Sequence, residues 1–202
     1  MRKKRKREPY KGHKTIRTVC FCSGIIIIFA VLFFSEGCNC NRCEDRINPN
    51  IDSTFCHISS KGMTLWWKVE NDSLHISFNA PGKGWVAVGI NPSWDNVMTD
   101  ANFIVGYVKD GVAYIQDEYG ISINLREPDT SIGGTEDVRL IGGWEYCEKT
   151  EIEFIIPMKS TDIRDRILNE GISYIVILSY GPEWQDYFGL SFVKMVFETI
   201  QL

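Results

Sequence analysis

The sequence has 202 residues, with 22 Lys/Arg against 26 Asp/Glu, and these charges are distributed unevenly along the chain. Residues 1–17 contain nine of the basic residues and one acidic residue, which leaves 13 basic against 25 acidic residues and a net charge of −12 in the remainder. So acidic a remainder argues against binding of nucleic acid or anionic lipid, and it suits a cationic partner or high solubility.

The N-terminal region is typical of an export signal, because a basic flank precedes a long apolar run. No charged residue occurs between Arg17 and Glu36, and the centre of this gap, residues 25–34, is wholly apolar. The uncharged stretch 18–35 is about as long as the shortest helix that spans a bilayer. The positive-inside rule places the basic end in the cytoplasm and the acidic part outside. A cytosolic protein with a basic tail would instead leave the apolar run exposed.

These features predict a single-pass protein of the cell membrane whose C-terminal part is extracytoplasmic. A lipoprotein modified at Cys38 is the alternative, because Ser35-Glu-Gly-Cys38 loosely resembles a lipoprotein signal. The expected organisation is a basic cytoplasmic segment (1–17), a transmembrane or signal anchor (18–35), a Cys-containing polar tether (36–56) and a globular domain (57–202).

Five cysteines follow the apolar run, and an odd number leaves at least one free, lipid-modified or intermolecular. The three between Cys38 and Cys43 lack a fourth ligand at zinc spacing, so disulfides or free thiols are favoured over a metal cluster. Cys56 precedes the first predicted strand, and Cys147 lies in the turn of a predicted hairpin. We therefore predict a disulfide between Cys56 and Cys147.

From about Met63 the chain alternates between short apolar runs and turn residues. Leu74, Ile76 and Phe78 are separated by polar residues, which predicts a strand with one buried face. Ser160-Thr-Asp162 resembles a helix cap, and Gly171 a helix end, so one short helix is expected at 162–170. An all-β, antiparallel sandwich of one domain is therefore predicted. Its nine strands are expected at 63–69, 74–78, 84–90, 102–108, 112–117, 138–146, 150–156, 172–180 and 190–197.

The sequence contains no recognisable catalytic set. Only His57 and His75 follow the apolar run, so a Ser-His-Asp or Cys-His arrangement is not expected. No Gly-rich phosphate loop or zinc spacing is present, and no carboxylate spacing singles out a glycosidase pair. The domain is therefore more typical of a binding or electron-transfer module than of an enzyme.

The loop after the strand 84–90 carries the two residues best suited to hold a ligand. Met98 ends this loop, and its thioether can either fill the core or ligate a metal such as haem iron. Trp94 lies in the same loop and is suited to line a cleft by stacking on a porphyrin or a sugar.

Several stretches in this order resemble the DOMON family, over roughly residues 57–200. This family includes extracytoplasmic β-sandwich domains of dopamine β-monooxygenase and of some dehydrogenase cytochromes. The resemblance implies an immunoglobulin-like sandwich, one end of which holds either b-type haem or a sugar-like ligand. The matching stretches are Gly84–Gly89, Met98, Ala101–Val108, Thr150–Pro157, Asp162–Asp165 and Ile177–Gly181.

In haem-binding members the iron is held by the loop methionine and by a histidine near the start of the last strand. Met98 matches that methionine, but the stretch Asp186–Met195 contains no histidine, and Ser191 lies near the expected place. Some relatives use lysine, which makes Lys194 the candidate second ligand. Alternation leaves open whether Lys194 faces inward with Phe192 or outward.

Together with the predicted membrane anchor, the resemblance implies a membrane-tethered electron-transfer domain that binds haem b and exchanges electrons with a redox partner. A redox-inert module that binds an extracellular, carbohydrate-like ligand, or an interaction domain, is the alternative.

Overall fold

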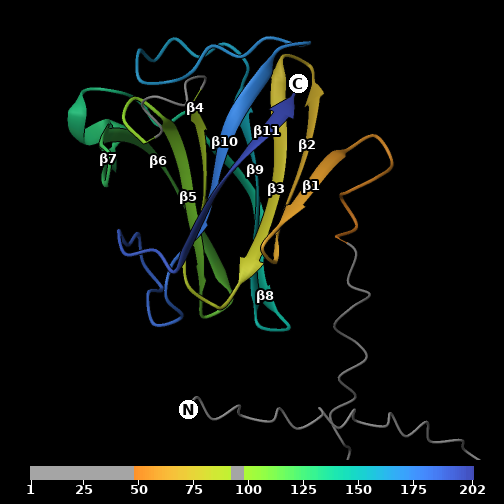
Figure 1. Ribbon diagram of the computed structural model, residues 1–202, viewed down its shortest axis with the longest axis vertical. Helices are drawn as coiled ribbons and strands as arrows, with labels where there is room; N and C mark the ends of the chain where they lie inside the picture. Colours follow the sequence, from red (N-terminus) through yellow and green to blue (C-terminus); the bar gives the residue numbers. More distant parts are fainter. Residues whose placement is uncertain (1–47, 92–97) are drawn as a thin grey trace, which may run out of the picture. The chain divides into compact units, whose positions relative to one another are not determined.

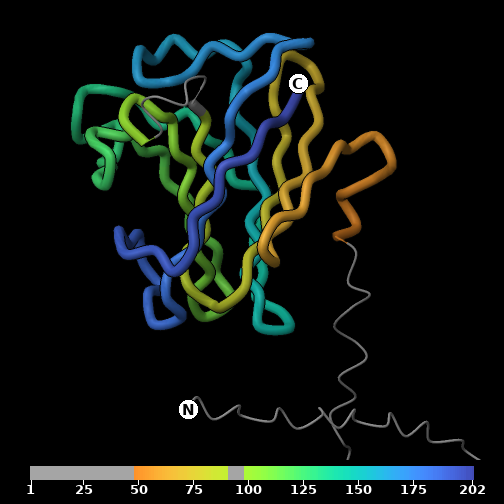
Figure 2. The backbone as a smooth tube through the Cα atoms, in the orientation of Figure 1, coloured from red at the N-terminus to blue at the C-terminus, as the bar shows by residue number. Residues whose placement is uncertain are grey.

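The computed structural model describes residues 48–91 and 98–202, which form an antiparallel sandwich of two sheets (Figure 1). The strand order is β1-β2-β3-β9-β8 in one sheet and β11-β10-β4-β5-β6-β7 in the other. The chain passes from one sheet to the other more than once, as the tube in Figure 2 shows. The predicted all-β sandwich is thus confirmed. Its elements are β1 (Cys56–Ser60), β2 (Met63–Glu70), β3 (Ser73–Pro81), β4 (Val86–Asn91), β5 (Asn102–Lys109), β6 (Val112–Ser122), β7 (Leu125–Pro128), the 3-10 helix η3 (Asp129–Ile132), β8 (Arg139–Tyr146), β9 (Lys149–Pro157), β10 (Ser173–Tyr180) and β11 (Lys194–Gln201).

The main core lies between the two sheets and is built by alternating apolar residues. Ile76 of β3, for example, is buried and pairs with the buried Phe154 of β9. Alternate residues of a strand face opposite sides of its sheet, and the inner rows of β3 and β9 are apolar. Their outer rows carry mostly polar residues that are themselves partly or fully buried, such as Ser77 and Glu151, which are joined by a 3.0 Å hydrogen bond. The inner core includes Met63, Leu65, Leu74, Ile76, Phe78, Val86, Val88, Ile90, Ile104, Ile152, Phe154, Val176 and Leu178.

All nine predicted strands are present, and two further strands are not in the prediction. β1 carries mostly exposed residues at the edge of its sheet, and β7 spans only Leu125–Pro128, so neither has a clear apolar alternation. The last strand begins at Lys194 rather than at residue 190.

The helix predicted over residues 162–170 is wrong, because the connection between β9 and β10 consists of turns. Asp162 accepts a 2.8 Å hydrogen bond from the backbone N–H of Arg164, and its other oxygen accepts from the backbone N–H of Thr135. Such side-chain bonds compete with a helix, and a helix this short depends on packing for its stability. Ile163 is 85% exposed, so the apolar pattern does not supply that packing.

The disulfide predicted between Cys56 and Cys147 is also wrong. Cys56 is an exposed free thiol, whereas Cys147 is disulfide-bonded. Cys56 lies in β1, where it pairs with Trp67, whereas Cys147 lies in the turn between β8 and β9. The partner of Cys147 is therefore outside the described residues.

The predicted anchor 18–35 and Trp94 fall outside the described residues as well. Within 48–91 and 98–202, no helix has the length and apolarity needed to cross a bilayer.

Candidate functional site on the outer face of the six-stranded sheet

A second apolar cluster covers the outer face of the six-stranded sheet, which we call the outer cluster. It arises because Trp85 and Ala87 of the β4 region alternate with inner-core residues, as Phe103 and Val105 do on β5. A sheet that is apolar on both faces needs a cover on the outer side or a ligand there. The outer cluster consists of buried Trp85, Ala87, Met98, Ala101, Phe103, Val105 and Ile177, with partly buried Tyr107, Phe188 and Met195 packed against them.

Met98 joins the outer cluster at the end of the sheet where β4 ends and β5 begins. Its side chain is 6% exposed. Its backbone lies directly on Gly120 of β6, where a Cβ atom would come within 1.7 Å of the Met98 carbonyl oxygen. Gly120 also exchanges backbone hydrogen bonds with Asp100 and Ala101, at 2.8 and 2.9 Å. A glycine at this position therefore lets the loop close against β6 and turns the thioether toward the cluster.

Trp85 lies near the other end of the outer cluster and is covered by the connection between β10 and β11. Its indole Nε1 donates a 2.8 Å hydrogen bond to Oε1 of the buried Gln185. The Arg126 guanidinium lies 4.6 Å from the ring centre, an attractive cation–π arrangement. This part of the face is thus filled by side chains of the chain itself.

Arg126 is held over Trp85 by a buried ion pair. Its Nε lies 2.7 Å from Oε2 of Glu118, and both side chains are 4% exposed. Burial raises the pKa of Glu118, and the Arg126 charge partly opposes that shift. Arg126 also donates to the carbonyl oxygen of Gly189, so the pair ties β6 and β7 to the β10–β11 connection.

Beside Trp85, aromatic side chains reach the solvent. The rings of Tyr107 and Tyr114 stack at 4.8 Å with an angle of 12°, and Phe188 meets Tyr107 edge-on at 4.9 Å. Aromatic pairs of this kind form a stiff surface with apolar faces and polar hydroxyl edges. We call these three residues the aromatic surface. The neighbouring β10–β11 connection adds exposed Trp184, Tyr187, Leu190, Phe192 and Val193.

The structure does not bring Met98 and Lys194 together. Lys194 is exposed and pairs with Tyr180, which pairs in turn with Val86 at the beginning of β4. Met98, in contrast, follows the end of β4. The first and last residues of β4, Val86 and Asn91, are five residues apart, which corresponds to about 17 Å along an antiparallel strand. Lys194 and Met98 are therefore separated by about this distance along the strand direction.

Two residues near the expected second ligand join the outer cluster and are absent from the sequence prediction. Met195, the neighbour of Lys194, and Phe188 both pack there. Alternation in β11 could have indicated Met195 only if the pairing register had been known. His57 and His75 belong to β1 and β3 of the five-stranded sheet, so neither lies on this face.

A family model matches residues 59–181, and its description is the DOMON domain. The chain belongs to the DOMON family. The match covers most of the sandwich, including Met98 and the beginning of the β10–β11 connection.

Two solved structures are similar to this DOMON domain. One is the cytochrome b domain of pyranose dehydrogenase from Coprinopsis cinerea, with 13% identity, a TM-score of 0.56, and coverage of 74% of this chain and 85% of that one. The other is the cytochrome domain of cellobiose dehydrogenase from Myriococcum thermophilum, with 9% identity, a TM-score of 0.49, and coverage of 73% and 81%. Among curated proteins, no sequence matches this chain. At these identities the likeness concerns the fold alone.

Proposed function

We propose that this DOMON domain is a membrane-tethered, extracytoplasmic binding module that holds a ligand with an apolar face, such as a carbohydrate, on its aromatic surface. The observation that supports this most directly is the stacked pair Tyr107–Tyr114, with Phe188 against it and exposed aromatic residues beside it. Sugar rings present C–H faces that stack on such rings, while hydroxyl groups hydrogen-bond at the rim. The basic N-terminus and the apolar stretch 18–35 support the extracytoplasmic placement.

Haem b bound for electron transfer is the second candidate, and Met98 is the residue that favours it. Its thioether is buried, and the family resemblance matches it to the loop methionine that ligates iron in haem-binding DOMON domains. The fold is also similar to that of a cytochrome b domain. The described residues fit such a group incompletely. Met98 offers one soft ligand, but on the outer face no histidine is described and Lys194 lies at the far end. A thioether alone is a weak ligand for ferric iron, so haem is the second choice.

The two candidates are separable because they use opposite ends of the outer cluster. The full-length chain, purified in detergent, is titrated with haemin and followed by visible absorption. We expect no thioether-ligated spectrum. A Soret and α-band pattern that Met98→Leu abolishes, and that Met158→Leu leaves intact, would establish haem instead. Met158 is the matched control, because it is an equally buried methionine of the inner core.

Carbohydrate binding is tested on the same material with an oligosaccharide array followed by titration of the hits. We expect Tyr114→Ala to weaken binding at least tenfold, because it removes one face of the stacked pair. Ile163→Ala is the control, since Ile163 is a more exposed apolar residue far from this sheet face. Equal binding by both variants would refute the assignment of the aromatic surface.

A further inference from the structure

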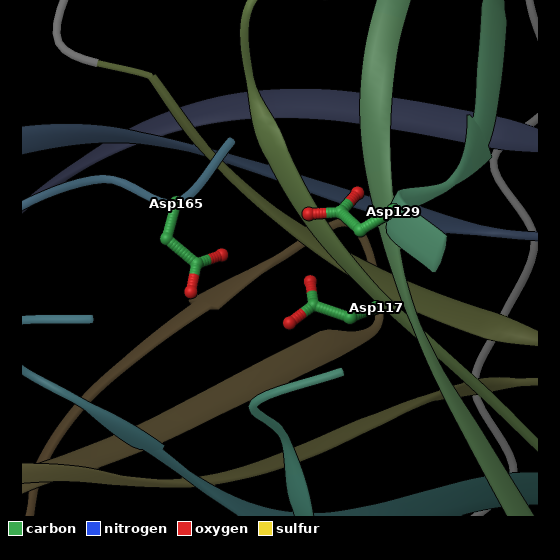
Figure 3. A group of neighbouring side chains, drawn as sticks. All are labelled: Asp117, Asp129 and Asp165. Carbon is green, nitrogen blue, oxygen red and sulfur yellow. The ribbon is translucent and has the colours of Figure 1, made fainter. Parts of the chain in front are cut away.

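Three aspartates from distant parts of the sequence meet at the end of the sandwich beside the β9–β10 connection. Asp117 lies on β6, Asp129 begins η3, and Asp165 lies in the connection. One carboxylate oxygen of each lies within 4.8 Å of the others. Figure 3 shows the three side chains pointing toward one another from three separate segments.

Asp117 points into the space between the sheets because it pairs with Ile104, a residue of the inner core. Its side chain is 2% exposed, and neither of its oxygens has a hydrogen-bond partner. Oδ1 of Asp129, which is 1% exposed, lacks a partner as well. A buried polar atom without a partner costs free energy, and a buried charge without one costs more.

An unpaired amide oxygen provides a second, independent sign of a missing ligand. Asn102 begins β5 and is 4% exposed. Its Nδ2 donates a 2.7 Å hydrogen bond to Oδ1 of Asp165, which fixes the amide beside the three carboxylates. Its Oδ1, however, is buried and has no partner. The site thus gathers buried oxygen acceptors, several of which have no hydrogen-bond donor among the described residues.

The protein compensates the charges in this cluster only in part. Burial, followed by repulsion from Asp165 and Asp129, raises the pKa of Asp117 to about 9. The backbone N–H of Asp137 opposes this shift but does not reach full hydrogen-bond geometry. Burial also raises the pKa of Asp129 to about 7, although Arg164 lowers it, and that of Asp165 to about 6.

We propose that Asp117, Asp129 and Asp165 bind one Ca²⁺ ion, with the side-chain oxygen of Asn102 as a further ligand. Carboxylate and amide oxygens are the ligands that hard divalent cations prefer, whereas zinc and copper favour nitrogen or sulfur. The inference does not depend on what the outer face binds.

Tolerance of irregular geometry favours Ca²⁺ over Mg²⁺. Ca²⁺ binds oxygen at about 2.3–2.6 Å and accepts irregular geometry, so two of its ligands can lie roughly 5 Å apart. Mg²⁺ binds at about 2.0–2.1 Å and requires a near-ideal octahedron, which limits the separation to about 4 Å. The three carboxylates come from segments that the fold already positions, so the ion that accepts irregular geometry is the better match.

The ion would cross-link β6, η3 and the β9–β10 connection. Hydrogen bonds already join the β9–β10 connection to the segment between η3 and β8: Asp162 accepts from Thr135, and Ser160 donates to Asp137. Bound Ca²⁺ would remove the repulsion at the centre of this junction and stabilise the folded domain, because the unfolded chain does not hold the three carboxylates together.

The test uses the full-length chain in detergent, freed of metal with EDTA and desalted. Calorimetric titration with Ca²⁺ is expected to give one site per chain, and thermal unfolding should shift upward by about 5–10 °C at Ca²⁺ near 100 times Kd. Mg²⁺ should bind at least tenfold more weakly. Absence of binding at 10 mM Ca²⁺, roughly the upper limit for extracellular sites, would overturn the proposal, and tighter binding of Mg²⁺ would overturn the choice of ion.

Asp117→Asn tests the assignment without changing the size of the side chain. It should lose at least tenfold in Ca²⁺ affinity together with the thermal shift, while Asp110→Asn, in the exposed β5–β6 turn, behaves as wild type. In EDTA, Asp117→Asn should unfold at the same or a higher temperature than wild type, because near neutral pH it removes a buried carboxyl that must take up a proton on folding. A purely structural Asp117 predicts the reverse. If Asp117→Asn does not fold, the same Ca²⁺ titration and thermal unfolding are carried out on Asp165→Asn. Wild-type Ca²⁺ affinity in whichever of the two variants folds would refute the site.

Discussion

Lys194 and Met98 lie at opposite ends of the six-stranded sheet, because Lys194 aligns with the beginning of β4 and Met98 follows its end. Replacing Lys194 should therefore leave any haem spectrum unchanged. We expect Lys194→Ala and wild type to give the same absorption bands in a haemin titration, with a change in unfolding free energy below about 0.5 kcal/mol for this exposed residue. A spectral shift in Lys194→Ala would mean that the β10–β11 connection moves across the sheet to reach the haem.

The buried ion pair Arg126–Glu118 should matter far more for stability than the exposed pair Lys83–Glu148. Arg126→Met leaves Glu118 buried without its partner and removes the guanidinium from Trp85, so unfolding free energy should fall by about 3–5 kcal/mol. Lys83→Met breaks a 3.5 Å pair that is 48% and 75% exposed, and should cost less than about 1 kcal/mol.

Chemical denaturation of the two variants in parallel provides the measurement. Equal losses in both would show that the cover over Trp85 contributes little to the folded state.

The metal-free protein should become less stable as the pH rises. The folded-state pKa of Asp117 is about 9, against a usual value of 3.8, so the native state holds a proton that the unfolded chain has released. The stability that this bound proton contributes is therefore fully present below about pH 4 and is lost by about pH 9. Asp129 and Asp165 act in the same direction, with pKa values of about 7 and 6.

Other carboxylates also titrate, so the informative quantity is the difference between wild type and Asp117→Asn. In EDTA, the urea midpoint of wild type minus that of Asp117→Asn should be largest at pH 5 and smallest at pH 9. Saturating Ca²⁺ should flatten or reverse this trend, since the ion requires the ionised carboxylates. A difference that does not vary with pH would show that Asp117 is ionised throughout.

Cys147 should be bonded to a cysteine of the tether, because Cys56 is free. Asn48 donates a 2.7 Å hydrogen bond to Glu151, which places the beginning of the described chain beside the β8–β9 hairpin that contains Cys147. Cys43 precedes Asn48 by five residues, and an extended stretch of this length spans about 17 Å.

Peptide mapping under non-reducing conditions should therefore recover Cys147 linked to Cys38, Cys40 or Cys43. Loss of the bond in Cys147→Ser should lower unfolding free energy by roughly 2–4 kcal/mol, whereas Cys56→Ser should have little effect. A recovered Cys56–Cys147 peptide would contradict the free thiol.

Topology remains a prediction from the basic residues 2–17 and the apolar stretch 18–35. Protease added to intact cells should release the acidic domain and leave an N-terminal epitope protected. Permeabilised cells, in which both ends are digested, serve as the control. Protection of the acidic domain in intact cells would place it in the cytoplasm.

Alternation of apolar and polar residues determined most of the fold before any tertiary information was available. The rows at 74–78 and 152–156 form the buried faces of β3 and β9, because side chains of period two must segregate when one face is covered. The helix predicted at 162–170 depended on cap residues instead, and it was wrong: Ser160 and Asp162 have the residue types of a helix cap but bond to other segments. Cap residues and turn residues are the same amino acids, so tertiary partners decide between them.

Sequence alone therefore determined the two-sheet sandwich, the DOMON resemblance, the basic and apolar N-terminus, and Met98 as a loop methionine, since each depends on residues close together in the chain. Only the tertiary structure decided that Lys194 is remote from Met98, because strand register is set by pairing across the sheet. It alone gathered Asp117, Asp129 and Asp165, whose spacing in sequence carries no metal signature. Their oxygens meet because the middle of β6, the start of η3 and the turn-rich β9–β10 connection pass close together in the folded domain, a fact that no local pattern contains.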